Sequence, residues 1–186
     1  MLKILFLYLL ILTGCSEIPS TDEINKDIIT IESQIKETKE AIKDHSGGLL
    51  QKMAQIRLEI LKSTKEMLNQ KKVGLNRYIP VSYSINGNEF TPPSNKNELL
   101  LELNQEISQL KNDLLNAQEE SSRYSGGLLK LTSLMQEATV SNTIAFVKQR
   151  QLLLKHDIPY FSFITKTLKK RDTYTKPATD KDFDNL

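Results

Sequence analysis

The residues able to do chemistry in this chain are few and widely separated. Its 186 residues include two histidines, His45 and His156, and one cysteine, Cys15. No motif for a metal, a nucleotide or a catalytic nucleophile surrounds any of them. His45 fits the surface or the packing face of a helix, and His156 fits the end of a helix, where a cation is favourable. We therefore expect no enzymatic activity, no metal and no cofactor.

A serine followed by two glycines and two leucines occurs twice, as Ser46-Gly47-Gly48-Leu49-Leu50 and as Ser125-Gly126-Gly127-Leu128-Leu129. This pentapeptide is not a nucleophile elbow, which requires Gly-x-Ser-x-Gly, and it lacks the Gly-Lys-Ser/Thr of a phosphate loop. The two copies lie 79 residues apart (126 minus 47), and the same shift aligns the chain with itself from about Ile28 to Ile85. The pentapeptide therefore marks an internal duplication.

The composition predicts a helical, well-solvated protein of one domain. The chain has no tryptophan, 26% charged residues and a formal net charge of +2, with both signs interspersed. A nucleic-acid-binding protein concentrates basic residues on one face, so no nucleic acid is expected as a partner. Nothing in the composition or the motifs indicates a small-molecule substrate.

The first residues have the pattern of a targeting segment. Lys3 precedes nine apolar residues, at positions 4–12, which are too few to span a bilayer. They end in Leu12-Thr13-Gly14-Cys15, which resembles the lipobox of bacterial lipoproteins. The resemblance covers residues 1–15 alone, and no characterised family is identified for the mature chain.

The lipobox resemblance implies a membrane anchor. It implies that a signal peptide, residues 1–14, is cleaved off. It also implies that Cys15 then carries a diacylglycerol thioether on its sulfur and an acyl chain such as palmitate on its amino group. Ser16, in place of Asp, implies the outer membrane with the protein facing the periplasm, although the inner membrane and the cell surface stay open. Residues 15–20 would form a lipid-anchored tether, and three acyl chains hold a protein at a membrane in an effectively permanent way.

Apolar residues spaced by three, four and seven predict two long helices, over residues 21–77 and 96–157. The diglycines allow two interpretations. A turn at each would give a four-helix bundle, and two glycines inside a helix cost about 2 kcal/mol. However, Ile42 and Leu49 keep the seven-residue phase across Gly47-Gly48, and no capping residue follows the glycines. We therefore favour continuous helices in a long antiparallel coiled-coil hairpin.

The connection over residues 78–95 alternates apolar and polar residues around Asn86-Gly87, which predicts a β-hairpin at the tip of the long hairpin. The connection is too short to span an 85 Å helix, so the two helices must run antiparallel. Folding about Asn86-Gly87 would bring the two diglycines together in the middle of the rod. The expected helix-crossing patch consists of Ser46, Gly47, Gly48, Ser125, Gly126 and Gly127.

The C-terminal part divides into an aromatic and basic segment, 158–171, and a tail, 172–186, whose composition predicts disorder. Aromatic residues followed by basic ones fit a lipid–water interface. They fit equally an apolar plug packed on the helix ends. The candidate interface residues are Tyr160, Phe161, Phe163, Lys169, Lys170 and Arg171.

Two functions agree with these features. The first is a membrane-anchored structural or scaffolding lipoprotein of the bacterial envelope that acts through self-association or helix packing. The second is a binding module, an accessory subunit or inhibitor that docks onto an envelope enzyme or complex. Either function implies the membrane as one partner, and a homo-oligomer or an envelope protein as the other.

Overall fold

The computed structural model describes residues 21–44, 47–79, 81–85 and 88–160. Within these ranges the chain forms helices α2 (Thr21–Asp44), α3 (Gly48–Asn76), α4 (Lys96–Ser122) and α5 (Gly127–Lys155). Strands β1 (Ser84–Ile85) and β2 (Asn88–Glu89) pair between α3 and α4. The predicted all-α class is confirmed.

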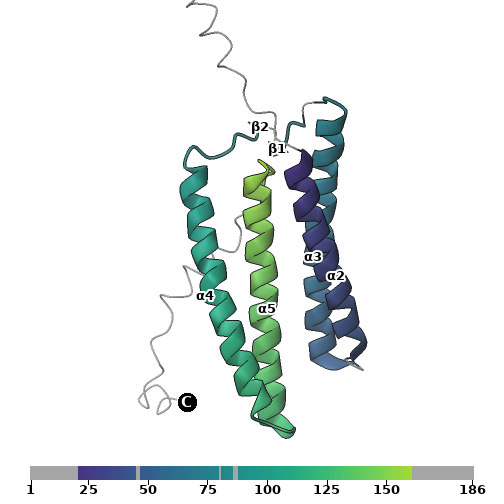
Figure 1. The fold of residues 1–186 in the computed structure, drawn as a ribbon, viewed down its shortest axis with the longest axis vertical. Coiled ribbons are helices and arrows are strands. Elements are labelled where there is room, and N and C mark those ends of the chain that lie inside the picture. Colours follow the sequence, from purple (N-terminus) through teal and green to yellow (C-terminus); the bar gives the residue numbers. More distant parts are fainter. Residues whose placement is uncertain (1–20, 45–46, 80, 86–87, 161–186) are drawn as a thin grey trace, which may run out of the picture.

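The chain reverses direction at both diglycines, so the continuous helices predicted over 21–77 and 96–157 are wrong. Gly47 has φ 136°, and the equivalent residues Gly48 and Gly127 have φ 78° and 80°. A right-handed helix needs a negative φ, and glycine reaches positive values without steric cost. Figure 1 shows the result as two helical hairpins, α2–α3 and α4–α5, with both diglycine turns at the lower end. The four-helix interpretation is therefore the correct one.

The glycines do not form a helix-crossing patch. A Cβ atom added to Gly47, Gly48, Gly126 or Gly127 would meet no atom within 4 Å. Ser125 is exposed as well, and Ser46 lies outside the described residues. Because each hairpin turns at its diglycine, these residues lie at open turns at the end of the bundle rather than between two helices in its middle.

The duplication is visible in how α3 and α5 end. Tyr78 and Asp157, which are 79 residues apart (157 minus 78), both adopt φ 54°. In both places the next residue donates its backbone N–H to a carbonyl of the preceding helix. Ile79 donates to the Gly74 carbonyl at 3.0 Å, and Ile158 donates to the Leu153 carbonyl at 2.8 Å. A left-handed residue followed by such a bond is a common helix C-terminal motif. The two repeats therefore share their local backbone geometry.

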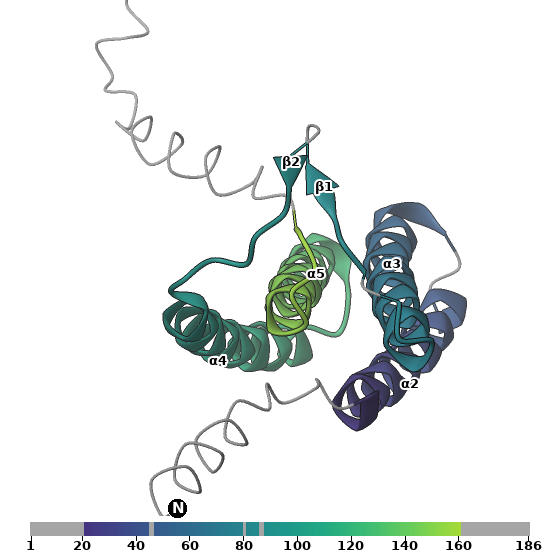
Figure 2. The same cartoon turned by 90° about the horizontal axis from the view of Figure 1, so that it is seen from above.

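The two hairpins meet through α3 and α5. Viewed along the helices, α5 lies between α4 and α3, and α2 packs on α3 with its first turns close to the end of α5 (Figure 2). Most buried apolar residues gather near the end where α2 begins and α5 ends. One cluster joins α2, α3 and α5 through Ile24, Ile28, Ile31, Leu61, Leu68, Leu153 and Ile158, and a second joins α4 to α5 through Leu103, Ile107, Val147 and Leu154.

The paired strands lie at this same end of the bundle (Figure 1). Ser84 pairs with Glu89 and Ile85 with Asn88 in antiparallel register, while the predicted tip turn Asn86-Gly87 lies outside the described residues. The predicted long hairpin would have placed the connection, residues 78–95, at the end of the molecule remote from Thr21. That placement is wrong, because each hairpin brings the chain back to the end where it started.

A substitution at Gly74 tests how the connection packs on α3. An alanine Cβ there would overlap Val81 Cγ2 and lie 3.4 Å from the Ile79 carbonyl oxygen. Gly74→Ala should lower the free energy of unfolding by about 1–3 kcal/mol in chemical denaturation, because overpacking outweighs the helix propensity of alanine. Gly126→Ala is the control, since nothing lies within 4 Å of it. Equal effects of the two substitutions would contradict this packing.

Candidate functional site

The two Gly-Leu-Leu copies place exposed leucines at the diglycine end of the molecule. Leu49 is 54% exposed on α3, and Leu128 and Leu129 are 77% and 61% exposed on α5. Leu131 is exposed one turn further along α5, and Leu115 is exposed on α4. Exposed apolar residues also lie elsewhere on the bundle, including Ile29, Val73, Tyr78 and Leu101. Single ones are ordinary on protein surfaces, whereas neighbouring ones such as Leu128, Leu129 and Leu131 are typical of an interaction surface.

The α4–α5 hairpin extends beyond the α2–α3 hairpin at this end. Two hydrogen bonds join α5 to α3, from Asn142 to the Met53 carbonyl at 3.0 Å and from Gln149 to the Ile60 carbonyl at 3.5 Å. Each joins residues 89 apart in sequence, whereas the repeats are 79 apart. The parallel helices α3 and α5 are therefore out of step by ten residues, or about 15 Å.

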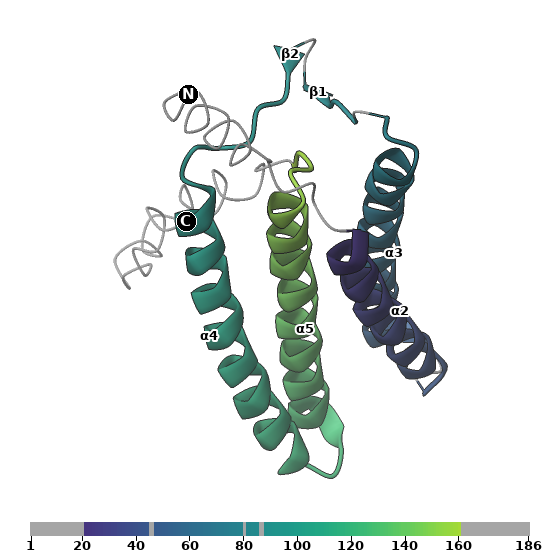
Figure 3. The same ribbon diagram turned by 45° about the horizontal axis from the view of Figure 1, so that its top comes forward.

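This offset creates an overhang and a notch. We call the first ten residues of α5, 127–136, with the end of α4 beside them, the overhang, and the space below the α2–α3 turn the notch. Figure 3 shows the α4–α5 turn reaching well below the α2–α3 turn. Leu128, Leu129 and Leu131 all belong to the overhang, which lies beyond the level at which α3 begins, and all three are exposed.

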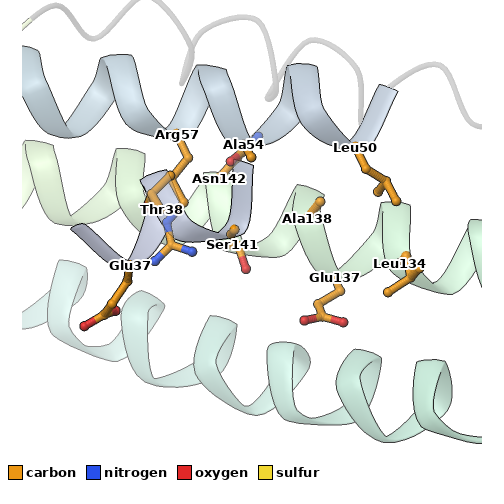
Figure 4. Close-up of a pocket in the computed structure, with 11 residues that line it drawn as sticks. Glu37, Thr38, Leu50, Ala54, Arg57, Leu134, Glu137, Ala138, Ser141 and Asn142 are labelled. Carbon is orange, nitrogen blue, oxygen red and sulfur yellow. The ribbon is translucent and has the colours of Figure 1, made fainter. Parts of the chain in front are cut away.

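A groove opens above the notch, between α2, α3 and α5. Its larger cavity has a volume of about 310 Å³, and a second cavity of about 190 Å³ continues toward the core. Figure 4 shows the larger one, lined by Glu37, Thr38 and Ala41 of α2, by Leu50, Ala54 and Arg57 of α3, and by Leu134, Glu137, Ala138, Ser141 and Asn142 of α5.

Two cations in this groove have no ion-pair partner among the described residues. They are Arg57 in the larger cavity and Lys148 in the smaller one. Burial lowers the pKa of Arg57, and the charge of Glu37 opposes that shift. Burial also lowers the pKa of Lys148, helped by the positive charges of Lys111 and Arg57. The groove therefore holds positive charge that the protein does not neutralise.

Charges at the opposite end of the molecule are fully paired and join α2 to α5. Asp27 Oδ2 lies 2.8 Å from His156 Nε2 and 2.9 Å from Lys155 Nζ, and Lys155 Nζ also contacts Glu23 Oε1 at 2.9 Å. Burial opposes the charge of Lys155, but its hydrogen bonds to Asp27 and Glu23 prevail and raise its pKa. His156 is buried and ends α5, as its sequence position predicts, and its contact with Asp27 could not be foreseen.

Most of the residues that the sequence predicted to contact a membrane lie outside the described part of the chain. Leu12, Thr13, Gly14 and Cys15 lie outside the described residues, so the lipid anchor stays a prediction. Phe161, Phe163, Lys169, Lys170 and Arg171 also lie outside them. Tyr160 is described and packs against both core clusters, with the Arg150 guanidinium 5.5 Å from its ring centre. For Tyr160 the plug interpretation therefore describes the packing.

Comparisons with known proteins identify no relative. No family model, no curated protein and no solved structure matches this chain. Among the described residues, no helix combines the length and apolar character needed to cross a membrane. The same residues contain no group of three or more histidine, cysteine, aspartate or glutamate side chains placed to hold a metal ion.

Replacing Asp27 tests the charge network that joins α2 to α5. Asp27→Asn removes the carboxylate that faces both Lys155 and His156, so the free energy of unfolding should fall by about 1–3 kcal/mol. The control is Glu119→Gln, which breaks the exposed Glu119–Arg123 pair and should change stability by less than about 0.5 kcal/mol. Equal losses in the two variants would contradict a special role for the network.

The acid dependence of Glu23 gives a second readout of this network. The hydrogen bond and charge of Lys155 lower the pKa of Glu23 from its ordinary 4.5. Its contribution to stability is therefore fully present above pH 4.5 and is lost as the pH falls through the folded-state pKa. Glu23→Gln should be slightly less stable than the native chain at pH 7, and the two unfolding curves should converge in acid. A difference that persists unchanged in acid would contradict the assignment.

Proposed function

We propose that the protein is a membrane-anchored scaffolding lipoprotein of the bacterial envelope, which associates with a second copy of itself through the overhang. The anchor is the acylated Cys15, as the lipobox implies, and the bundle follows a tether that ends where α2 begins at Thr21. The overhang lies at the other end of α2, remote from the anchor (Figure 1). This arrangement holds the apolar surface away from the lipid, where a partner can reach it.

The observation that carries this proposal is the ten-residue offset between α3 and α5. It makes the overhang and the notch of one molecule equal in length, at about 15 Å. A second copy turned end for end could therefore place its overhang in the notch of the first and receive the first overhang in its own. Such an interface is self-complementary, as expected for a two-fold dimer, and it would cover Leu128 and Leu129 of both copies.

An accessory role is the second candidate. The exposed leucines of the overhang fit an apolar groove on an envelope enzyme or complex as well as they fit a second copy. The protein would then be a binding module or inhibitor whose activity depends on that partner. The mass of the crosslinked species separates the two candidates, because a self-associating scaffold gives twice the mass of one chain.

Full-length protein in cells, treated with a crosslinker and then fractionated, tests the proposal. The native chain should remain with membranes and give a crosslinked dimer. Leu128→Ser with Leu129→Ser should remain with membranes and lose most of the dimer, because the interface loses its apolar contacts. Cys15→Ser should leave the membrane fraction, since no described helix can hold it there.

The matched control replaces two exposed apolar residues outside the overhang, Ile29 and Leu101, with serine. It should keep both the membrane location and the dimer. A crosslinked species of another mass that depends on Leu128 and Leu129 would favour the accessory role. A dimer that survives in the Leu128→Ser, Leu129→Ser variant would exclude the overhang as the interface.

A further inference from the structure

The groove between α2, α3 and α5 has an apolar part and a polar part. Ala41, Leu50, Ala54, Leu134 and Ala138 supply the apolar part of the 310 Å³ cavity. Arg57 lies one turn beyond Ala54 on α3 and Ser141 one turn beyond Ala138 on α5, so both polar groups lie toward one end of the cavity (Figure 4). Within the described residues, the Ser141 hydroxyl makes no hydrogen bond, and the buried Nε of Arg57 also has no partner. A cavity of this size with a few convergent polar groups is typical of a small-ligand site.

The polar groups around the cavity are those that attract an anion. The charges of Arg57 on α3 and Lys111 on α4 both act on Lys148 of α5, so cations from three helices lie near one another. Glu37 is the only carboxylate whose charge acts on Arg57 and Lys148. Among the described residues no ion pair joins Glu37 to either cation, and its carboxylate points away from the Arg57 guanidinium in Figure 4. One further negative charge would therefore be stabilised here.

Other groups near the cavity are already occupied. Glu137 accepts hydrogen bonds from Gln118 and Ser121 of α4, and Asn142 donates its amide to the Met53 carbonyl. Thr38 donates its hydroxyl to the Gln34 carbonyl at 2.7 Å. Arg57, Lys148 and Ser141 are among the lining groups left to recognise a ligand, and the side-chain amide of Gln34 in the smaller cavity is another. A guanidinium presents paired N–H donors that match the oxygens of a carboxylate or a phosphate.

We propose that this groove binds an amphipathic organic anion, whose carboxylate or phosphate group contacts Arg57, Ser141 and Lys148 and whose apolar body lies on Ala41, Ala54 and Ala138. The site shares Leu134 with the overhang, but the three polar groups that would contact the ligand lie outside the overhang. Half-buried cations without partners destabilise a fold, so a binding role accounts for their presence where a purely structural role does not.

Calorimetric titration of full-length protein in lipid nanodiscs tests the site, with empty nanodiscs as the blank. Octanoate and octyl phosphate are the two anionic probes, and octanol is the uncharged probe. At least one anion should bind saturably, and octanol should bind at least about tenfold more weakly, because it gives the guanidinium no charge to pair with. The anion that binds more tightly identifies the headgroup that the site prefers.

Two variants separate binding from folding. Arg57→Met should weaken the binding of the anion about tenfold or more. Lys148→Met should weaken that binding several-fold and raise the midpoint of thermal unfolding, because it removes a half-buried charge that other cations repel. Arg123→Met, on the exposed face of α4, is the control and should leave binding unchanged. No saturable binding of either anion, octanol binding as tightly as they do, or native affinity in a folded Arg57→Met protein would overturn the proposal. A lowered unfolding midpoint in Lys148→Met would overturn it as well.

Discussion

The packing of α3 against α5 is the interaction on which the rest of this structure depends. Each hairpin is held together by its own short connection, whereas this contact, the core beside it and the charge network around Asp27 join the two repeats. Parallel helices from a duplicated sequence could have met in register, with equivalent residues side by side. They meet instead ten residues out of step, as the bonds from Asn142 and Gln149 show. The overhang, the notch and the groove all follow from that offset.

The offset also explains why the two ends of the molecule differ. At the end where α2 begins, α3 runs past the end of α5, and Ile158, Tyr160 and Tyr83 pack into the space that results. At the diglycine end, α4 packs beside the first turns of α5, but α3 begins too late to reach them. Large apolar residues therefore fill one end, whereas the buried residues toward the other end are small or polar, such as Ala117, Ser121 and Ser133. Apolar surface that the fold leaves uncovered is available for association.

The sequence predicted the duplication, the helical class and the ends of both repeats. The continuous helices were wrong because the in-phase pair Ile42 and Leu49 is compatible with a helix and with a hairpin alike. The absence of a capping residue after Gly47 was also misleading. No side chain caps α3 or α5, since Gly48 and Gly127 turn the backbone by themselves through a positive φ.

The candidate site could not be predicted from the sequence for a different reason. Arg57 and Lys148 lie on amphipathic helices rich in charged residues, where a solvated position is the ordinary outcome. They approach each other only because α3 and α5 are offset, and the offset is a property of how two similar surfaces pack.

A distance between spin labels on α3 and α5 tests the offset most directly. With cysteines introduced at the exposed residues Gln70 and Thr132 in a Cys15→Ser background, pulsed electron paramagnetic resonance reports their separation. The observed register places Gln70 level with position 159 (70 plus 89), 27 residues beyond Thr132, so the separation should be about 40 Å. Helices packed in register would bring the two labels to within about 30 Å, and that result would contradict the account.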